Sequence, residues 1–316
     1  MSRLLGIVFC ASVFLAGGYA FSPRSIPQFP ATGLRVDTVL LLDAARAGAR
    51  LVAAGERGRI FLSDDEGAGW RPAKSPTEAT LTALYFVDAR RGWAVGHDAV
   101  ILRSTDGGES WQQVHSAPEE QRPLLDIRFL GAEHGIAIGA YGAYLESRDG
   151  GRTWAARRIA EGDRHFNALA AAGDRQYIAG ESGTLLSSED RGAQWVALAS
   201  PYKGSLFGIL GAGGSDLVAF GLRGNVFHSA NQGRDWRAAE STTQASLMGG
   251  RALAPGTAVL AGQDGTLLVT RDGGRSFTLH RHAGGSAFAT VAPAANGDLL
   301  AFGERGVTRI PGMARP

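Results

Sequence analysis

The sequence predicts an all-β fold, a seven-bladed β-propeller, and two observations carry this prediction. Six eight-residue stretches fit one pattern, which we call the box: Ser or Thr, then Asp or Asn, then Gly, then a closing Trp or Phe at fixed offsets. The closing aromatic residues lie 41 residues apart, except for one interval of 43. Each period also contains short runs rich in β-branched residues between glycine-containing turns, a pattern that is typical of β-strands. A fixed period in the low forties indicates a repeat architecture with one blade per repeat.

The stretch between residues 124 and 154 shows how one repeat divides into strands. Leu124–Leu130 is an apolar run that we expect to form the inner strand, and Gly135–Gly139 follows a polar turn as the second strand. Tyr144–Ser147 alternates in polarity, and Thr153–Trp154 begins a fourth strand after a turn of Asp and Gly residues. Four short strands in one such repeat make one blade of a propeller.

The inner strand and the glycine turn that follows the second strand both recur seven times, although the box recurs only six times. The inner strands are expected to begin near Val36, Leu81, Leu124, Phe166, Leu206, Leu247 and Ala287. The last repeat therefore lacks the sequence of a fourth strand.

The missing strand has a candidate at the other end of the chain. A ring of blades has to close, because an open ring leaves two strand edges that invite aggregation. We expect the extended, proline-rich segment of residues 21–35 to close the ring by pairing with Val307–Ile310. Residues 36–310 would then form the propeller, and residues 311–316 a tail. Six blades followed by a loose tail is the alternative.

Residues 1–20 have the features of a signal peptide. Arg3 gives a short positive region, Leu4–Ala16 is an apolar run, and Gly18–Ala20 offers small residues at a cleavage site. We expect export to the periplasm, with an uncleaved anchor as the alternative. Cys10, the one cysteine of the chain, lies inside this segment. The mature protein would therefore have neither a disulfide nor a thiolate metal site.

The overall charge argues against nucleic acid as a partner. Among 316 residues, 32 Lys and Arg are balanced by 30 Asp and Glu, a formal net charge of +2. Nucleic-acid-binding domains carry a clear excess of basic side chains. Lys74 and Lys203 are the only lysines, so almost every basic side chain is an arginine. This bias suits either GC-rich coding or the recognition of carboxylates.

The box combines a hydroxyl, a carboxylate and glycine, but its variation favours a structural role over a catalytic one. Asn231 replaces Asp in one copy, and Thr270 and Phe277 replace Ser and Trp in another. Asn can accept a turn hydrogen bond but cannot ionise, so a catalytic carboxylate would not tolerate this exchange. We expect the box to hold a tight turn and its aromatic ring to fill the gap between blades. The box residues are Ser63, Asp65, Gly67, Trp70, Ser104, Asp106, Gly108, Trp111, Ser147, Asp149, Gly151, Trp154, Ser188, Asp190, Gly192, Trp195, Ser229, Asn231, Gly233, Trp236, Thr270, Asp272, Gly274 and Phe277.

The box resembles the Asp-box, also called the bacterial neuraminidase repeat. The longer pattern of Gly92–Gly96 followed by Ile101–Trp111 resembles the repeat of the photosystem II stability and assembly factor family, over residues 36–310. This resemblance implies an exported seven-bladed propeller without enzymatic activity or cofactor, which binds a membrane protein or helps a membrane complex to assemble. Because some bacterial relatives lie beside exporters of the resistance–nodulation–division type, such an exporter is one candidate partner.

One face of the propeller is the expected binding surface. The loop into each inner strand and the turn between the second and third strands emerge on this face, opposite the boxes. Arg and Tyr are enriched at protein interfaces, and loops on a rigid scaffold often carry function. Acidic residues lie among them, so an ordinary solvated surface is the alternative. The expected partner-binding residues are Arg57, Arg59, Arg122, Tyr141, Arg164, His165, Tyr202, Lys203, Arg223 and Arg305.

A sialidase-like glycoside hydrolase is the enzymatic alternative, since those enzymes share the box and the propeller. Their chemistry needs an arginine cluster, a tyrosine nucleophile and a carboxylate beside it. Tyr141, Tyr144 and Glu181 are expected together on the face opposite the boxes, but the even spacing leaves no room for an elaborated active-site loop. A sugar-binding lectin is a third alternative. His280 and His282 lack a third ligand nearby, so no metal site is expected.

Overall fold

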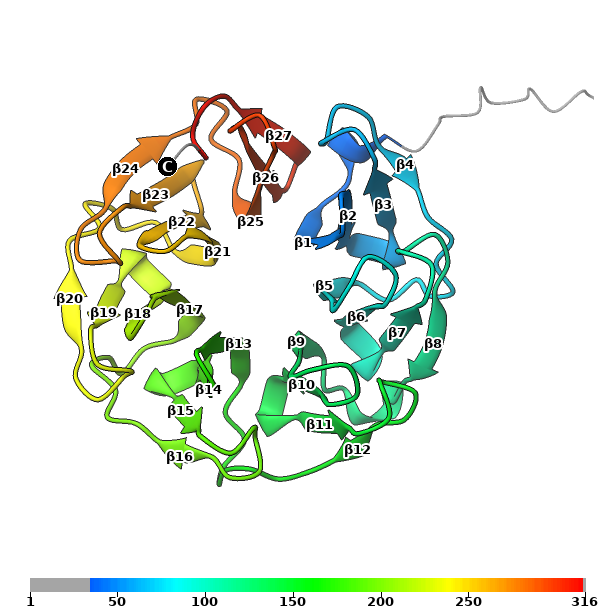
Figure 1. Cartoon of the computed structure of the whole chain (residues 1–316), viewed down its shortest axis with the longest axis horizontal. Coiled ribbons are helices and arrows are strands. Elements are labelled where there is room, and N and C mark those ends of the chain that lie inside the picture. Colours follow the sequence, from blue (N-terminus) through cyan, green and yellow to red (C-terminus); the bar gives the residue numbers. More distant parts are fainter. Residues whose placement is uncertain (1–34, 315–316) are drawn as a thin grey trace, which may run out of the picture. The chain divides into compact units, whose positions relative to one another are not determined.

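The computed structural model describes residues 35–314, which form a ring of seven β-sheets around a central opening (Figure 1). Six sheets have four antiparallel strands in sequence order, and the seventh has three within the described residues. The prediction of an all-β, seven-bladed propeller is therefore confirmed. In every blade the first strand is innermost, and the later strands follow outward (Figure 1).

The first strand of each blade is its longest, and the second strand is almost entirely buried. The first strands are β1 (Leu41–Ala47), β5 (Leu81–Phe86), β9 (Leu124–Phe129), β13 (Phe166–Ala172), β17 (Leu206–Gly213), β21 (Leu247–Ala254) and β25 (Phe288–Pro293). The second strands are β2 (Arg50–Gly55), β6 (Gly92–Gly96), β10 (Gly135–Gly139), β14 (Arg175–Gly180), β18 (Asp216–Gly221), β22 (Thr257–Gly262) and β26 (Leu299–Gly303).

The outer strands are shorter. The third strands are β3 (Ile60–Ser63), β7 (Ile101–Ser104), β11 (Tyr144–Ser147), β15 (Leu185–Ser188), β19 (Val226–Ser229), β23 (Thr266–Thr270) and β27 (Gly306–Ile310). The fourth strands are β4 (Arg71–Pro72), β8 (Gln112–His115), β12 (Ala155–Ala156), β16 (Val196–Ala197), β20 (Arg237–Ala239) and β24 (Thr278–Arg281). Single turns of 3-10 helix are η1 (Val36–Thr38), η2 (Glu56–Gly58), η3 (His97–Ala99), η4 (Pro118–Glu120), η5 (Ala140–Gly142), η6 (Glu181–Gly183) and η7 (Leu222–Gly224).

The first inner strand begins later than the sequence indicated. Val36–Thr38 forms the turn η1, and β1 begins at Leu41. The backbone of Val36 lies against blade seven, where a Cβ on Gly306 would meet the Val36 carbonyl oxygen at 1.9 Å. The residues around Val36 therefore pack on the neighbouring blade before the chain enters β1. The last inner strand begins at Phe288, one residue after the expected Ala287.

The six boxes form one repeated hydrogen-bonded turn. In each, the Ser or Thr hydroxyl donates to the Asp or Asn side chain at 2.8–3.0 Å and accepts the N–H of the box glycine at 2.8–2.9 Å. The same Asp or Asn oxygen accepts the N–H of the residue before the aromatic ring at 2.8–3.1 Å. Asn231 keeps both bonds, so the turn needs an acceptor oxygen at this position and not a charge.

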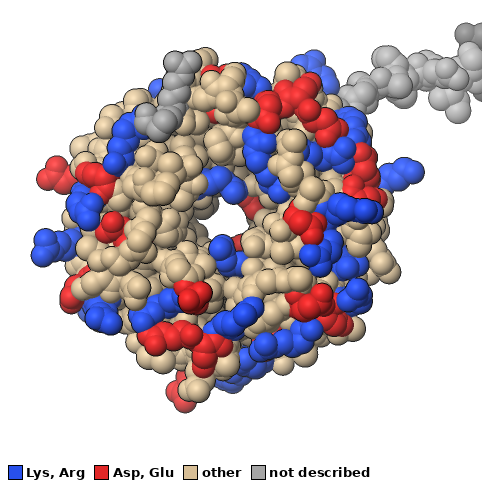
Figure 2. Space-filling view, viewed as in Figure 1, with Lys and Arg blue, Asp and Glu red and all other residues tan. Residues whose placement is uncertain are grey.

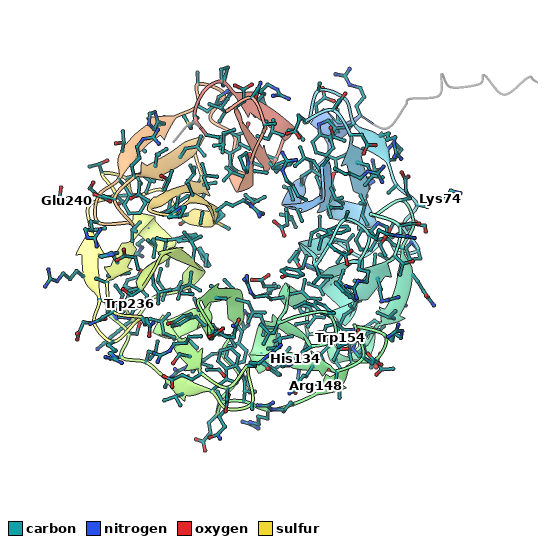
Figure 3. All side chains as sticks on the ribbon, viewed as in Figure 1. Lys74, His134, Arg148, Trp154, Trp236 and Glu240 are labelled. Atoms are coloured by element: carbon teal, nitrogen blue, oxygen red, sulfur yellow. The ribbon has the colours of Figure 1, made fainter. Side chains whose placement is uncertain are left out.

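Each box also packs onto the preceding blade. Gly151 of blade three has a φ of +70°, and a Cβ there would meet Nε1 of Trp93 in blade two at 2.0 Å. A larger residue is therefore excluded by both conformation and space. The rings of Trp154 and Trp236 join apolar clusters that draw on two neighbouring blades (Figure 3). The core of the propeller is thus a series of apolar layers between blades.

Blades one and seven pack together by the same contacts and close the ring. The ring of Trp70 meets Phe302 edge to face at a centroid distance of 5.9 Å. The Arg309 guanidinium of β27 donates to the carbonyl oxygen of Glu66 in the first box at 2.6 Å. Residues more than 200 positions apart in the sequence therefore form the last interface of the ring.

The outer edge of β27 has no strand partner within residues 35–314. The expected pairing of residues 21–35 with Val307–Ile310 falls almost entirely on residues outside the described part of the chain, as does the expected signal peptide. Among the described residues, no helix is long and apolar enough to cross a membrane.

Candidate functional site

A repeated hydrogen bond places two sets of loops on one face, which we call the loop face. In all seven blades, the residue after the second strand donates its N–H to the carbonyl oxygen of the residue that leads into the first strand, at 2.9–3.2 Å. The donors are Glu56, His97, Ala140, Glu181, Leu222, Gln263 and Glu304. The acceptors are Leu40, Thr80, Pro123, His165, Ser205, Ser246 and Ala287. The loop face consists of these turns and of the segments that lead into the inner strands.

The turns of the loop face hold one side chain per blade in an outward position. Arg57, Tyr141 and Arg223 occupy the middle of their turns with φ of +53°, +55° and +57°. This left-handed conformation is uncommon for residues other than glycine, and here a following residue with positive φ completes a tight turn. The three side chains are exposed, and half of the Tyr141 surface is open to solvent.

The structure brings together four of the ten predicted partner-binding residues, on blades three and four. The ring of Tyr141 meets His165 edge to face at a centroid distance of 4.8 Å, and the N–H of Gly142 donates to the Arg164 carbonyl oxygen at 2.9 Å. Arg122 and Tyr141 also line a cavity of about 310 Å³ beside this turn. This group of Arg122, Tyr141, Arg164 and His165 is the aromatic–basic cluster of the loop face.

The other predicted residues are dispersed around the ring. Four of them are exposed: Arg57 on blade one, Lys203 between blades four and five, Arg223 on blade five and Arg305 on blade seven. Arg59 is half-buried. Tyr202 is also half-buried, since its ring packs against Phe227 at a centroid distance of 5.7 Å. We therefore expect Tyr202 to support the fold of its loop more than it contacts a partner.

The geometry of the tyrosines does not resemble that of a glycosidase. Tyr144 is buried in β11, where its hydroxyl accepts a hydrogen bond from Nε1 of Trp195 at 3.4 Å. Burial raises its pKa to about 12, the opposite of what a nucleophile needs. The expectation that Tyr144 would lie on the loop face is therefore wrong.

No group of three or more His, Cys, Asp or Glu side chains among residues 35–314 is arranged to hold a metal ion.

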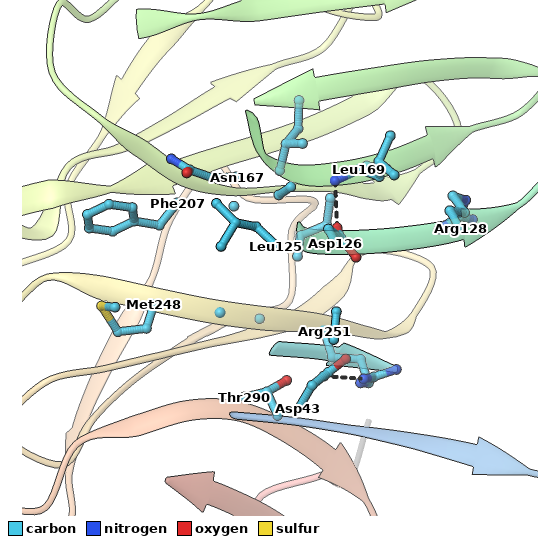
Figure 4. A pocket seen from close by; sticks show the side chains of 18 of the residues that line it. Asp43, Leu125, Asp126, Arg128, Asn167, Leu169, Phe207, Met248, Arg251 and Thr290 are labelled. Carbon is cyan, nitrogen blue, oxygen red and sulfur yellow. Dashed lines mark hydrogen bonds and ion pairs between the residues drawn. The ribbon is translucent and has the colours of Figure 1, made fainter. Parts of the chain in front are cut away.

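A second site, which the sequence did not indicate, lies in the central channel. The first strand of every blade has a β-bulge at its second residue. This residue therefore has no partner in the neighbouring second strand of the blade. These seven residues line one cavity of about 410 Å³ (Figure 4). They are Leu42, Thr82, Leu125, Asn167, Phe207, Met248 and Ala289. Because they lie at the start of the inner strands, they form the mouth of the channel on the loop face.

Charged side chains of both signs line the same cavity. Asp43, Asp126, Arg128 and Arg251 all contribute to its wall (Figure 4). Basic and acidic groups are also visible at the rim of the opening in the space-filling view (Figure 2). The sequence analysis missed this site, and the feature that could have indicated it is the aspartate within each of two apolar inner strands, Asp43 and Asp126, because a buried aspartate is rare without a partner.

The two aspartates of the channel each join neighbouring blades. Asp43 of blade one accepts the N–H of Leu84 in blade two at 2.8 Å, and Asp126 of blade three accepts the N–H of Leu169 in blade four at 2.6 Å. Burial raises the pKa of both carboxyl groups, that of Asp126 to about 7, against the lowering effect of these bonds. Asp43 lies 3.9 Å from the Arg251 guanidinium, whereas Asp126 has no ion-pair partner among the described residues.

Comparison with known proteins gives the family. The family model described as "Photosynthesis system II assembly factor YCF48" matches residues 62–123 and 115–257, which together make up more than half of the chain. The chain belongs to this family. The resemblance read from the repeat at Gly92–Gly96 and Ile101–Trp111 is thereby confirmed.

Curated relatives of this YCF48-family protein match it over short stretches. The photosystem II assembly protein Ycf48 of Thermosynechococcus vestitus is 37% identical over 43 residues, 14% of this chain and 12% of that protein. The chloroplastic photosystem II stability/assembly factor HCF136 of Cyanidioschyzon merolae is 30% identical over 102 residues, 30% of this chain and 23% of that protein. The matched part of the chain thus spans less than a quarter of either relative.

Solved structures match the whole ring. The structure "YCF48 bound to D1 peptide" has a TM-score of 0.70 at 20% identity and covers 91% of this chain and 99% of that one. YCF48 from Cyanidioschyzon merolae has a TM-score of 0.67 at 16% identity, with 87% and 96% covered. The WD40 propeller domain of Doa1 scores 0.69 at 12% identity, with 88% and 94% covered. These similarities show the fold of this YCF48-family protein and not its partner.

Proposed function

We propose that this protein is a non-enzymatic factor that assists the assembly or stability of a membrane protein complex by binding a segment of one of its subunits. Membership of the YCF48 family supports this function, since the curated relatives are named as photosystem II assembly or stability factors. One structure of similar fold is a YCF48 bound to a D1 peptide, which by analogy favours a protein segment as the ligand.

The aromatic–basic cluster of the loop face is the observation that carries the binding surface. An exposed tyrosine supported by His165, with Arg122 and Arg164 beside it, combines the side-chain types that contribute most to protein interfaces. The neighbouring cavity of about 310 Å³ gives a side chain of the partner a place to enter. We assign Arg57, Lys203, Arg223 and Arg305 to the outer part of the same surface, where exposed charges steer a partner more than they hold it.

The site of action follows from the signal-like sequence. We propose that residues 1–20 direct export and that the protein acts in the periplasm beside its membrane partner. A resistance–nodulation–division exporter has no support among the related proteins, so the proposal stops at a membrane protein. The glycoside hydrolase alternative has no support among them either.

Cross-linking in intact cells followed by affinity capture of the tagged protein tests this proposal. A variant in which Arg57, Arg122, Arg164 and Arg223 are all replaced by Glu should fold normally and lose a dominant membrane-protein partner. The matched control replaces four exposed arginines at the box end of the blades, Arg90, Arg152, Arg234 and Arg237, by Glu, and so changes the net charge equally. Capture that survives the loop-face change, or that both variants lose alike, would show that the loop face is not the binding surface.

A further inference from the structure

We propose that the mouth of the central channel is a binding site for a basic side chain, lysine or arginine, presented by an extended segment of the protein partner. The site combines an apolar collar with acceptor groups behind it. This inference rests on the proposed function for its partner, but the chemistry of the site is argued from the channel alone.

The collar consists of four bulged residues at the channel mouth: Leu125, Phe207 and Met248, which are labelled in Figure 4, and Leu42, which lines the same cavity. Leu42, Leu125 and Phe207 are partly exposed, and Met248 is 42% exposed, which is unusual for a large apolar side chain on an inner strand. Each bulge turns a side chain away from the blade and toward the opening. An aliphatic stem entering the channel would therefore be shielded from water on several sides.

Thr82 and Asn167 are the polar members of the same ring of bulged residues and lie level with the collar, whereas Asp126 lies one residue farther along its strand. Asn167 donates its amide N–H to the carbonyl oxygen of Leu206 at 2.8 Å, which leaves its side-chain oxygen to face the cavity. Thr82 donates its hydroxyl to the carbonyl oxygen of Leu124 at 2.7 Å. These bonds join neighbouring blades, so the Thr82 hydroxyl and one N–H of the Asn167 amide are already engaged when a ligand arrives.

The two channel arginines are engaged by other groups of the propeller, and neither forms an ion pair with Asp126 among the described residues. Arg251 donates through Nε to the carbonyl oxygen of Val291 at 2.9 Å and through Nη2 to that of Ala44 at 2.6 Å. Arg128 lies over the ring of Tyr85, 5.9 Å from its centroid. The Asp126 carboxyl group accepts two backbone N–H groups and forms no ion pair among the described residues, although the charge of Arg128 acts on it from a longer distance.

A basic side chain fits a channel in which an apolar collar is followed by the carboxyl group of Asp126. Lysine and arginine bury an aliphatic stem along apolar surface and keep a charge at the far end, so one side chain crosses the collar and meets the acceptors behind it. Asp126 is partly buried and has no ion-pair partner among the described residues, and a cation beside its carboxylate would offset the cost of removing that charge from water. Charge-assisted hydrogen bonds to the remaining lone pairs of Asp126 would then fix the depth of insertion.

The protein supplies its own probe for this site. The methionines are Met1, Met248 and Met313. After removal of the signal peptide, the protein would hold one methionine methyl group at the channel mouth and one near the end of the chain. With ¹³C-methyl-labelled methionine, the mature protein is titrated with the peptide acetyl-Gly-Ala-Lys-Ala-Gly-amide. The Met248 resonance should shift and saturate, while the Met313 resonance stays in place as an internal control.

Two comparisons isolate the charge. The peptide with norleucine in place of lysine keeps the aliphatic stem, and we expect it to bind at least tenfold more weakly to the unaltered protein. Asp126→Asn should weaken the lysine peptide to the level of the norleucine peptide, whereas Asp43→Asn should have a smaller effect because Arg251 already lies beside Asp43. Equal binding of both peptides, or no Met248 shift with lysine, overturns the proposal without any variant.

The same titration separates this inference from the proposed function. If spermidine binds more tightly than the lysine peptide, the ligand of the channel is a small polyamine and not a side chain of a protein partner, which overturns the proposal. Loss of cellular capture in the loop-face arginine variant with no Met248 response would uphold the assembly function and remove the channel site. A charge-dependent Met248 response without any captured partner would keep the site and remove the proposed function.

Discussion

Replacing one box hydroxyl tests whether the boxes hold the propeller together. Ser188 is 1% exposed, donates to Asp190 at 2.8 Å and accepts the N–H of the buried Gly192 at 2.8 Å. Ser188→Ala leaves that N–H without an acceptor and removes a bond to a charged group. An orphaned buried group costs about 1–3 kcal/mol, and water replaces the lost bond to the exposed carboxylate, so we expect a loss of about 1–3 kcal/mol in the free energy of unfolding.

The assay is urea unfolding followed by tryptophan fluorescence, with the adjacent Ser187→Ala as the matched control. Ser187 is 6% exposed and makes no side-chain hydrogen bond among the described residues, so its loss should cost less than about 1 kcal/mol. A thermal midpoint lowered by several degrees should accompany the larger effect. Equal losses for both variants, or a Ser188→Ala variant as stable as the unaltered protein, would refute the reasoning.

Two further predictions concern pH. The N–H of Thr153 holds the pKa of Asp149 well below its usual range, so this carboxylate adds stability above about pH 4 that is lost as the pH falls. Asp149→Asn, which copies the native Asn231, should flatten the acid limb of a plot of unfolding free energy against pH, and an unchanged limb would contradict the assignment. Burial instead raises the pKa of Asp126 to about 7, so its contribution should decline as the pH rises from 4 to 7. Asp126→Asn should reduce this decline by on the order of 2 kcal/mol, because the carboxyl group is only partly buried, and the remainder belongs to Asp43, whose pKa burial also raises; an unchanged decline would contradict the assignment.

The architecture was predictable because its determinants are local and repeated. Turn glycines and box residues recur at a fixed spacing, and each acts through bonds within its own turn, as Ser188 and Gly192 do. The face on which the loops lie was also predictable, since strand order in a blade alternates the ends of the sheet. The start of β1 was misplaced by several residues because Val36 packs on blade seven, a contact that no local pattern records.

The candidate sites were less predictable because they depend on contacts between blades. Tyr144 looked like a surface residue beside an exposed turn, but its side chain points toward Gly192 and Trp195 of the next blade. Asp126 stands inside the run Leu124–Leu130, which the sequence analysis describes only as apolar, and its partner, the Leu169 N–H, lies 43 positions away. The sequence holds both residues but not the inter-blade geometry that decides which is exposed.

The interface between blades one and seven has a consequence for how the chain matures. Trp70 cannot bury its ring against Phe302 until nearly the whole polypeptide has been synthesised, so the first blade waits for the last. Contacts of such long sequence separation are slow to form, and the unpaired blade edges stay exposed in the meantime. If the chain is exported N-terminus first, as we propose, the ring can close only after the C-terminal blade has also crossed the membrane.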